Sequence, residues 1–434
     1  MRYLSLIPMI AISSAYAAND HVRNSSYVPE GYKLIISSEF DSDLNDANGN
    51  ALWSDKYLAH WTATGEESKA EYEFENGALK LLIRKKQQAW DPKYDDETII
   101  SGIQTANKNL LHRWNANYPI VAEDVPSPQK IIENHIQKYG YFELKAKTYQ
   151  TINGGGVHTA WWMVGFQEDS DSFVGRYTED GVLKPRTKQT AEVDIFETLG
   201  RNTWDVQTAF HSWGGDDNIR WIRHGNADVN TADDFNVYGF LWTPENMRLY
   251  FNGRLIAQTT GSVHYPMLTL LGIYEKRHSS PQPWTGILTD YTYPKSFEID
   301  YWRSYMPNDM LNSINEAEYG ALSKNAITKY EVQASNGYVV SNLGMGEDLT
   351  YKAVYSSASQ EYRLDVDYFY NSDEVIMVSV NDGLPIEVIA PRTLGENSSK
   401  VTTSVHLNKG FNQIRLYNNS ADMPDIDKIV ISKY

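Results

Sequence analysis

Residues 191–198 read Ala-Glu-Val-Asp-Ile-Phe-Glu-Thr and set three acidic residues among apolar ones. In a β-strand successive side chains point to opposite faces, so Glu192 and Asp194 share one face and their apolar neighbours share the other. Glu197 is out of phase by one residue, and it joins the acidic face only if the strand carries a one-residue bulge near positions 195–196. Carboxylates held this close raise one another's pKa and cost stability, a cost that is usually kept for function. The stretch therefore predicts a bulged strand with a functional acidic face.

Short runs with strand character extend in both directions from this stretch, from about Tyr32 to Tyr305. Asn, Asp, Gly and Pro separate them, as in the Asn-Gly pairs at 76–77 and 252–253, which are typical turn residues. The pattern predicts an all-β protein whose main domain is a jelly-roll β-sandwich. The expected strands include Lys33–Ser37, Ala78–Ile83, Gly140–Thr148, Glu192–Glu197, Asp205–His211, Val237–Trp242, Met247–Phe251, Met267–Ile273 and Phe297–Ser304.

The chain divides into four expected segments. Residues 1–17 start with Met-Arg, continue with an apolar run and end in Ala-Tyr-Ala, which is typical of a secretory signal peptide. Residues 18–308 hold all 12 Trp and the acidic strand, and they form the predicted jelly roll. Residues 309–327 read as a linker or a short packing helix, because apolar residues recur at helical spacing from Met310 to Leu322. Residues 328–434 are long enough for a smaller β-sandwich.

Composition narrows the class of protein. The 434 residues include no Cys, which excludes disulfide scaffolds, thiolate metal sites and cysteine nucleophiles. A formal net charge of −17 disfavours phosphate backbones, so we expect no nucleic-acid partner. A membrane span needs about 20 apolar residues, and the sequence has no such run, so we expect a soluble secreted or periplasmic protein without a membrane span. An aromatic content of 13% fits a carbohydrate-active protein.

Carboxyl groups on one strand face suit one reaction in particular. Retaining glycoside hydrolysis uses two carboxyl groups about 5–5.5 Å apart, one as nucleophile and one as general acid/base. Glu192 and Glu197 can supply both if their side chains lean toward each other, with Asp194 between them tuning protonation. The alternative is a solvated strand face whose acidic residues are incidental.

The run Glu192–Glu197 resembles the E-[I/V/L]-D-x-x-E motif of glycoside hydrolase family 16 in its bulged form. Other segments resemble this family's strands in the family's order, although Asn236 stands where a His is common. These segments are Ser38–Asp41, Asn76–Leu79, Ser101–Ile103, Tyr139–Glu143, Ala160–Met163, Phe235–Glu245, Phe251–Gly253 and Phe297–Arg303.

The resemblance implies a jelly roll with a long cleft and a retaining endo-glycanase that acts on a polysaccharide and needs no cofactor for catalysis. It implies Glu192 as nucleophile, Asp194 as the assisting acid and Glu197 as general acid/base. His211 matches the family's histidine that faces the cleft, and the alternative is a satisfied histidine on a sheet face. We expect the protein to be a monomer.

Aromatic side chains supply flat stacking area for sugar rings at little entropic cost. The neighbours Trp161 and Trp162 must face opposite ways, and we assign Trp161 to the sugar and Trp162 to the core. The other substrate-binding candidates lie on or near strands and loops expected to flank the acidic strand, and they are Trp204, Trp213 and Trp284.

Two features bear on the substrate. Family members acting on plain β-glucans commonly carry a Trp-Pro pair before the acidic strand, where this chain has Gln189-Thr190-Ala191. Basic residues gather in loops expected to flank the cleft, where a guanidinium can pair with sulfate, although the plainer interpretation is solubilising charge. We therefore favour a red-algal galactan such as agar, porphyran or carrageenan. The alternatives are a β-1,3(4)-glucan of the laminarin or lichenan kind, and sugar binding without catalysis. The basic residues are Lys108, His112, Arg113, Arg176, Lys184, Arg186, Lys188, Arg220, Arg223, His224, Lys276, Arg277 and His278.

The C-terminal region resembles carbohydrate-binding modules of family 6 or 35. The resemblance implies a structural Ca²⁺ held by Glu331, Gln333 and Asp427, which are all oxygen donors; the alternative is a pair of surface acids. The segments that carry the likeness are Lys329–Ala334, Val405–Leu416 and Asp425–Val430.

Sugar binding in such modules usually pairs a Tyr with a Trp, and this region has no Trp. The aromatic and amide side chains that would have to substitute are Tyr351, Tyr355 and Tyr417 with Asn418 and Asn419.

Overall fold

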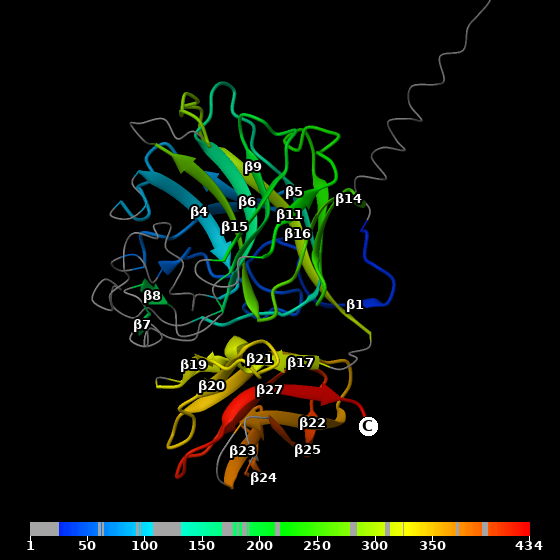
Figure 1. Cartoon of the computed structure of the whole chain (residues 1–434). Helices are drawn as coiled ribbons and strands as arrows, with labels where there is room; N and C mark the ends of the chain where they lie inside the picture. The colour runs from blue at the N-terminus through cyan, green and yellow to red at the C-terminus, as the bar shows by residue number, and fades with distance from the viewer. Residues whose placement is uncertain are drawn as a thin grey trace, which may run out of the picture.

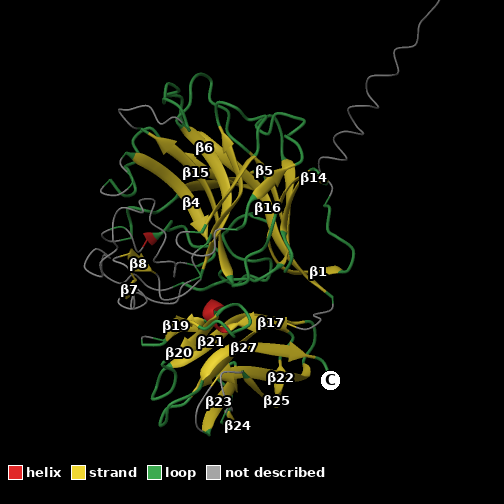
Figure 2. Ribbon diagram, in the orientation of Figure 1, coloured by secondary structure: helices red, strands yellow, loops and turns green. Residues whose placement is uncertain are grey.

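The computed structural model contains two β-sandwiches, one above the other in Figure 1, with the acidic strand in the upper one. Figure 2 shows that strands make up nearly all of the regular structure in the described part of the chain, which confirms the predicted all-β class. The signal peptide predicted at 1–17 lies outside the described residues. The structure describes residues 26–434 except 60–61, 63–64, 93–94, 96, 107–131, 167–176, 180–181, 185–188, 190, 213–217, 278–283, 309–312, 324, 370–372 and 393–397.

The larger sheet of the upper sandwich has nine strands. In spatial order they are β11 (Trp221–Arg223), β14 (Arg254–Thr259), β13 (Met247–Phe251), β12 (Asn236–Trp242), β5 (Gly140–Lys147), β16 (Lys295–Pro307), β3 (Ala78–Ile83) and β2 (Glu71–Glu75), with β1 (Tyr32–Ser38) also paired to β16.

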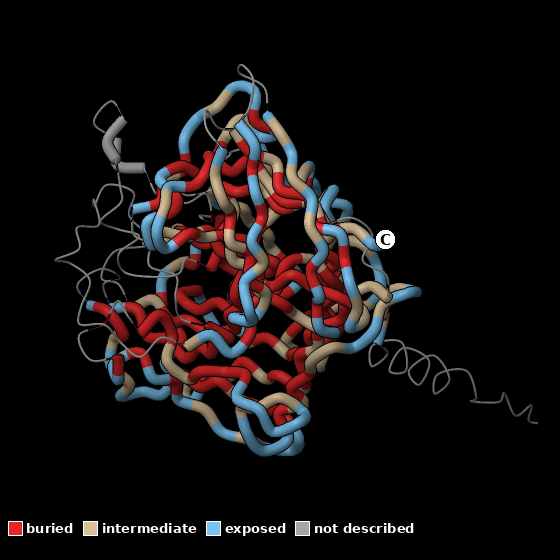
Figure 3. Tube along the Cα trace, turned by 90° about the horizontal axis from the view of Figure 1, so that it is seen from below, coloured by how far each residue is buried: buried red, intermediate tan, exposed pale blue. Residues whose placement is uncertain are grey.

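The facing sheet carries the acidic strand. Its five strands, in spatial order, are β10 (Gln207–His211), β9 (Glu192–Leu199), β6 (Val157–Gly165), β15 (Met267–Lys276) and β4 (Thr98–Gln104). Outside this sheet, β7 (Tyr177–Glu179) and β8 (Val182–Lys184) form a separate hairpin. The core lies between the two sheets, where Phe196 of β9 stacks on Tyr238 of β12 with ring centroids 4.3 Å apart. Figure 3 shows the buried residues gathered inside and the exposed ones on the outer loops.

The predicted strands and turns of this domain are confirmed, two of the strands to the residue at Ala78–Ile83 and Met247–Phe251. The hairpins at Asn76-Gly77 and Asn252-Gly253 have positive φ at both central residues. A tight hairpin turn of this type requires that backbone conformation, and Asn and Gly adopt it at the lowest steric cost.

The lower sandwich also has two sheets. The first is β19 (Ile327–Tyr330), β20 (Tyr338–Ser341), β27 (Asp425–Ser432), β22 (Gln360–Phe369) and β25 (Ser399–Leu407), with β17 (Ser313–Glu316) paired to β27; the second is β18 (Ala321–Leu322), β21 (Asp348–Ser356), β26 (Gly410–Tyr417), β23 (Glu374–Val380) and β24 (Ile386–Ala390). A separate apolar core of aliphatic and tyrosine side chains fills the space between them.

The predicted linker at 309–327, with its helical pattern, is wrong. β17 pairs with β27, a single 3₁₀ turn covers Ala317–Tyr319, and β18 pairs with β21, so the second domain includes residues from 313 onward. The spacing that resembles an amphipathic helix arises because Ala317 enters the core from the 3₁₀ turn and Leu322 enters it from the short strand β18. Pairing with β27 is a long-range contact, which local periodicity does not report.

The two sandwiches make direct contacts. The Gln189 side-chain amide donates to the carbonyl of Tyr319 at 3.0 Å, and Lys352 forms an ion pair with Glu133 at 3.1 Å. Tyr319 also packs its ring against Tyr265, with centroids 5.3 Å apart. Within the described ranges we find no helix that is long and apolar enough to cross a membrane.

Candidate active site

The acidic strand β9 carries the predicted bulge. Across the β6–β9 pair, Trp161 lies opposite Phe196 while Trp162 lies opposite Asp194, so Ile195 is an extra residue without a counterpart. The β10 side shows the same irregularity in its register. The extra residue brings Glu197 back into phase, because a one-residue insertion turns the following side chain to the other face. All three carboxylates therefore share the sheet face that points away from the core.

The three carboxyl groups are shielded from solvent to different degrees. Glu192 and Asp194 are only 2% and 4% exposed, and Glu197 is partly exposed. Burial, followed by the charge of Glu192, raises the pKa of Asp194 to about 8. Burial also raises the pKa of Glu197 well above its usual range, with Asp194 and Glu192 adding to the rise and Lys276 opposing it. At neutral pH Asp194 thus holds a proton, and the raised pKa of Glu197 favours its protonated form, since close carboxylates do not all ionise.

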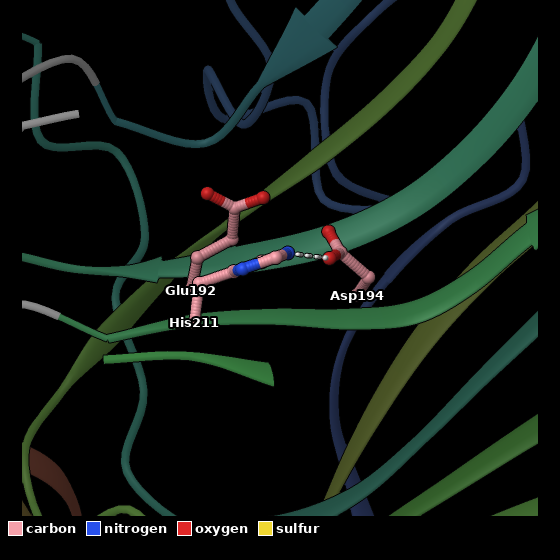
Figure 4. A group of neighbouring side chains, drawn as sticks. All are labelled: Glu192, Asp194 and His211. Carbon is pink, nitrogen blue, oxygen red and sulfur yellow. Dashed lines mark ion pairs between the residues drawn. The ribbon is translucent and has the colours of Figure 1, made fainter. Parts of the chain in front are cut away.

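His211 completes the acidic face from the neighbouring strand β10. Its Cα partner is Glu192, and its Nε2 lies 3.5 Å from Oδ2 of Asp194, as the dashed line in Figure 4 marks. The hydrogen bond to Asp194 raises the pKa of His211, whose side chain is 46% exposed. One ligand atom from each of Glu192, Asp194 and His211 falls within 4.8 Å of the others. His211 therefore lies beside the carboxylates, as the sequence predicts.

The assignment of Trp161 to the sugar is wrong. Trp161 is fully buried between the sheets, edge-on to Phe196 and Phe240, whereas Trp162 lies on the face of the carboxylates. Alternation required the two indoles to face opposite ways, but it left open which one faces the core. The indole N–H of Trp162 donates to the hydroxyl of Tyr274 at 2.9 Å.

A buried aromatic cluster continues from Trp162 along this sheet face. Tyr57 packs edge-on against Trp90 and Tyr274 with centroids 5.0 and 5.8 Å away, and Tyr274 stacks on His158 at 4.6 Å. The sequence analysis missed Tyr57, Tyr274 and His158 because they approach β9 from other strands and loops. Their rings make a rigid wall beside the carboxylates.

Two predicted aromatic residues do lie exposed near β9. Trp204 and Trp284 are 54% and 38% exposed, while Trp213 is outside the described residues. The indole N–H of Trp284 donates to Oε1 of Gln207 at 3.0 Å, and Gln207 is the β10 partner of Glu197. Gln207 was missed, although it lies four residues before His211 on one strand and this spacing predicts a shared face. Trp284 is thereby held next to the general acid/base candidate.

The basic residues that suggested a sulfated substrate are mostly engaged with protein acids where the structure describes them. Lys276 pairs with Asp95 at 2.9 Å, and Arg223 pairs with Asp205 at 2.8 Å. Arg277 is bonded to the buried carboxylate of Glu275. The candidates Lys108, His112, Arg113, Arg176, Arg186, Lys188 and His278, and the side chain of Lys184, lie outside the described part.

Two of the predicted calcium ligands of the second domain, Glu331 and Asp427, have different hydrogen-bond partners in the structure. Glu331 contacts the backbone N–H of Gln333 within a turn, whereas Asp427 accepts from the N–H and hydroxyl of Ser335 at 2.9 and 3.1 Å. The acidic neighbours of Asp427 are Glu316 and Glu318. Both lie in the segment mistaken for a linker, which is why the sequence analysis missed them.

Glu318 is the most deeply buried acid of this group. Its side chain is fully buried, its Oε1 accepts from Asn336 at 2.7 Å, and its Oε2 has no hydrogen-bond partner in the structure. Burial raises the pKa of Glu318 to about 7. Of the aromatic residues considered for sugar binding here, Tyr351 is buried in the domain core, and Tyr355 faces the first domain.

The jelly roll and its bulged acidic strand define a glycosidase. Residues 124–278 match the family model of glycosyl hydrolases family 16. Beta-porphyranase B of Phocaeicola plebeius is 22% identical over 259 residues, which cover 55% of this chain and 71% of that protein. Endo-1,3-1,4-beta-glycanase ExsH of Rhizobium meliloti is 29% identical over 255 residues, which cover 56% of this chain but only 46% of ExsH.

One solved structure extends the likeness in fold to both domains. A GlcNAcα1-4Gal releasing endo-β-galactosidase from Clostridium perfringens is 24% identical with a TM-score of 0.53, covering 94% of this chain and 99% of that chain. The same fold therefore runs through both sandwiches. A family 35 carbohydrate binding module from Clostridium thermocellum is 30% identical with a TM-score of 0.27, covering 27% of this chain and 97% of the module.

The raised pKa of Asp194 leads to a prediction about stability. A carboxyl with a folded pKa of about 8 against 3.8 unfolded stabilises the fold fully below about pH 4, and this contribution is lost as pH rises through 8. Asp194→Asn removes the titrating group. We therefore expect the unfolding free energy of this variant, relative to that of the wild type, to increase by at least about 2 kcal/mol from pH 5 to pH 8.

Thermal unfolding at both pH values measures this difference. The exposed Asp228, changed to Asn, is the matched control, and we expect its difference from the wild type to be small and equal at pH 5 and pH 8. A constant gap between Asp194→Asn and the wild type across this range would contradict the assigned protonation of Asp194.

Proposed function

We propose that this glycosidase is a retaining endo-β-glycanase, exported by the segment at 1–17 and acting as a monomer on a red-algal galactan. The observation that carries the proposal is the Ile195 bulge, which sets Glu192, Asp194 and Glu197 on one face of β9. Enzymes that retain configuration need a nucleophile and a proton donor close together on one side of the sugar.

The protonation pattern supports a division of roles. Glu197, whose pKa is raised well above its usual range, donates its proton to the leaving-group oxygen and then activates the water that releases the product. Glu192 attacks the anomeric carbon and forms the glycosyl ester. Asp194 stays protonated between them, which leaves the negative charge of the strand to Glu192. His211 lies against Asp194 and fixes its orientation.

The choice of a galactan rests on two supports. Gln189-Thr190-Ala191 stands where β-glucan-specific members commonly carry Trp-Pro, and one relative is named a β-porphyranase. The second candidate substrate is a β-1,3(4)-glucan, which the similarity to ExsH favours. Sugar binding without catalysis has less support, because it gives no reason for three carboxyl groups on one strand face, two of them buried.

The test is release of reducing ends from agarose, porphyran, carrageenans, laminarin and lichenan. We expect the galactans to be cut faster than laminarin and lichenan. Faster cutting of the glucans would move the assignment to the second candidate, and no release from any of the five would reject the proposed activity.

We also propose that the second domain holds a structural Ca²⁺ with the buried carboxyl of Glu318 as a ligand, beside its acidic neighbours Glu316 and Asp427. Ca²⁺ prefers carboxylate oxygens, and Glu318 offers a buried oxygen that lacks a hydrogen-bond partner. Burial raises the pKa of all three carboxyl groups, because it disfavours their charged carboxylate forms. A cation bound beside them would offset this cost. The ion would join β17 and the turn after it to β27.

Calcium is therefore expected to raise the melting temperature of the second domain relative to EGTA, since a ligand at 100 times its Kd adds about 2.7 kcal/mol. Glu318→Gln should lose most of this response, and Glu331→Gln should keep it, because Glu331 lies in a separate turn. Calorimetry of the full chain measures both. No response in the wild type, or a response lost in Glu331→Gln, would reject these ligands.

A further inference from the structure

The two sandwiches enclose a cavity of about 610 Å³ at their interface. Tyr139, Glu245 and His264 line it from the first domain, and Tyr319 and Tyr355 line it from the second. None of the carboxylates of β9 borders it. Its size lies within the range of small-molecule sites, which occur preferentially at domain interfaces.

The rings that line the cavity are held in place from behind. Tyr139 packs edge-on against Trp242 with centroids 5.6 Å apart, and Tyr355 packs against Phe411 at the same separation. Tyr319 lies against Tyr265 at 5.3 Å. Fixed aromatic rings lose little entropy when a flat apolar face stacks on them. The cavity is thus prepared for stacking on both of its walls.

Polar groups stand among these rings. The Tyr139 hydroxyl and Nδ1 of His264 lie 2.7 Å apart, and Lys138 is bonded to Oδ1 of Asn315. Burial lowers the pKa of Lys138 to about 8 and that of His264 to about 4, so His264 is neutral at neutral pH. Perturbed titratable groups around a cavity are typical of binding sites.

The charges at the cavity argue for an uncharged ligand. Lys138 is the cation among the described lining residues, and the carboxyl groups of Glu245 and Glu316 oppose it. A polyanion would meet those two acids, whereas hydroxyl groups can donate to them and accept from Lys138 and the Tyr139 hydroxyl. Aromatic rings with such mixed donors and acceptors suit a sugar.

A second, smaller cavity of about 290 Å³ adjoins the first. The two share His264, Tyr319 and Asn336, and the smaller one extends to Ala191, the residue before the nucleophile candidate Glu192. A ligand bound at the interface therefore lies against the segment that leads into the acidic strand.

We propose that the interdomain cavity is a second carbohydrate site that binds a neutral oligosaccharide of the kind the enzyme releases. The identity of that oligosaccharide rests on the proposed function, while the site itself rests on the cavity. Occupancy would hold the two domains together, because stacking on Tyr139 and on Tyr319 or Tyr355 engages both walls at once.

The experiment is calorimetric titration of the full chain carrying Glu192→Gln with neutral tetrasaccharides from agarose and from laminarin. We expect two binding sites per chain for the tetrasaccharide that fits. Ile314 lines the cavity and is 55% exposed, so Ile314→Trp narrows it. This variant should weaken one of the two sites by about tenfold or more.

Leu384→Trp is the matched control, because Leu384 is exposed on the second domain and absent from the cavity lining. It should keep both sites. If Ile314→Trp loses its near-ultraviolet circular dichroism, Glu245→Ala, at an exposed lining residue, takes its place. One site in the parent chain, or two sites that both cavity variants leave unchanged, would overturn the proposal. Hydrolysis by the wild-type chain reports separately on the proposed function.

Discussion

Glu192→Gln is expected to lower hydrolysis of the substrate polysaccharide by about 10⁴-fold or more. The amide has nearly the shape of the carboxylate, so the strand and its bulge should persist. It carries no charge and cannot form the glycosyl ester, so the first chemical step has no nucleophile. Rates of reducing-end release, compared at equal concentrations of folded protein, measure the loss.

The matched control for this prediction is Glu387→Gln, an exposed glutamate on strand β24 of the second domain. Its hydrolysis should equal that of the wild type. If Glu192→Gln instead keeps a rate within about tenfold of the wild type, Glu192 is not the nucleophile.

Glu197→Gln is expected to lower hydrolysis of the polysaccharide by about 10²–10⁴-fold, the usual contribution of a general acid/base. Its loss should be much smaller for the first step with an aryl glycoside, because a phenolate with a low pKa leaves without a proton. Adding azide should then speed release of the sugar, since azide attacks the glycosyl ester without a general base. Equal losses on both substrates, with no effect of azide, would contradict the acid/base role.

The same role predicts the alkaline side of the wild-type pH profile. Burial and the charges of Asp194 and Glu192 raise the pKa of Glu197, and the protonated form is the active one, so activity should fall as pH rises through that raised pKa. In Glu197→Gln this alkaline limb should disappear, because the amide does not titrate. A limb that survives in the variant must belong to another group.

The acidic strand shows how much of a strand's structure the spacing of its residues alone can predict. Glu197 is one residue out of phase with Asp194, and only a bulge near 195–196 makes the two share a face; the structure has that bulge at Ile195. A strand's period of two residues is fixed by its geometry, so a break in phase carries structural information. The neighbouring charge of Glu192, which contributes to the raised pKa of Asp194, follows from the sequence, whereas the larger cause, burial, depends on neighbouring strands and was not predictable.

The same period could not decide between Trp161 and Trp162. It requires opposite faces, but the choice depends on which face of β6 meets the larger sheet. The structure resolves this through the ring contacts of Trp161 with Phe240. The prediction for residues 313–322 was wrong for a related reason. The short strands of this segment are defined by their pairing with β27 and β21, which lie far along the chain.

The linker interpretation also limited which acidic residues the sequence analysis considered as calcium ligands. With residues 309–327 interpreted as a linker, Glu316 and Glu318 fell outside the predicted second domain, while the resemblance to carbohydrate-binding modules implied Glu331, Gln333 and Asp427. In the structure, Glu316, Glu318 and Asp367 are acidic neighbours of Asp427. An error in a domain boundary predicted from composition can therefore exclude residues from the prediction of a site.

The central claim is that Glu192 and Glu197 act as a nucleophile and its acid/base partner on one strand face. The most direct measurement is the anomeric configuration of the first product, followed by ¹H nuclear magnetic resonance during hydrolysis of the best substrate in the panel. The account predicts that the β-anomer appears first and then mutarotates. Initial release of the α-anomer would mean a direct attack by water, and it would contradict the account.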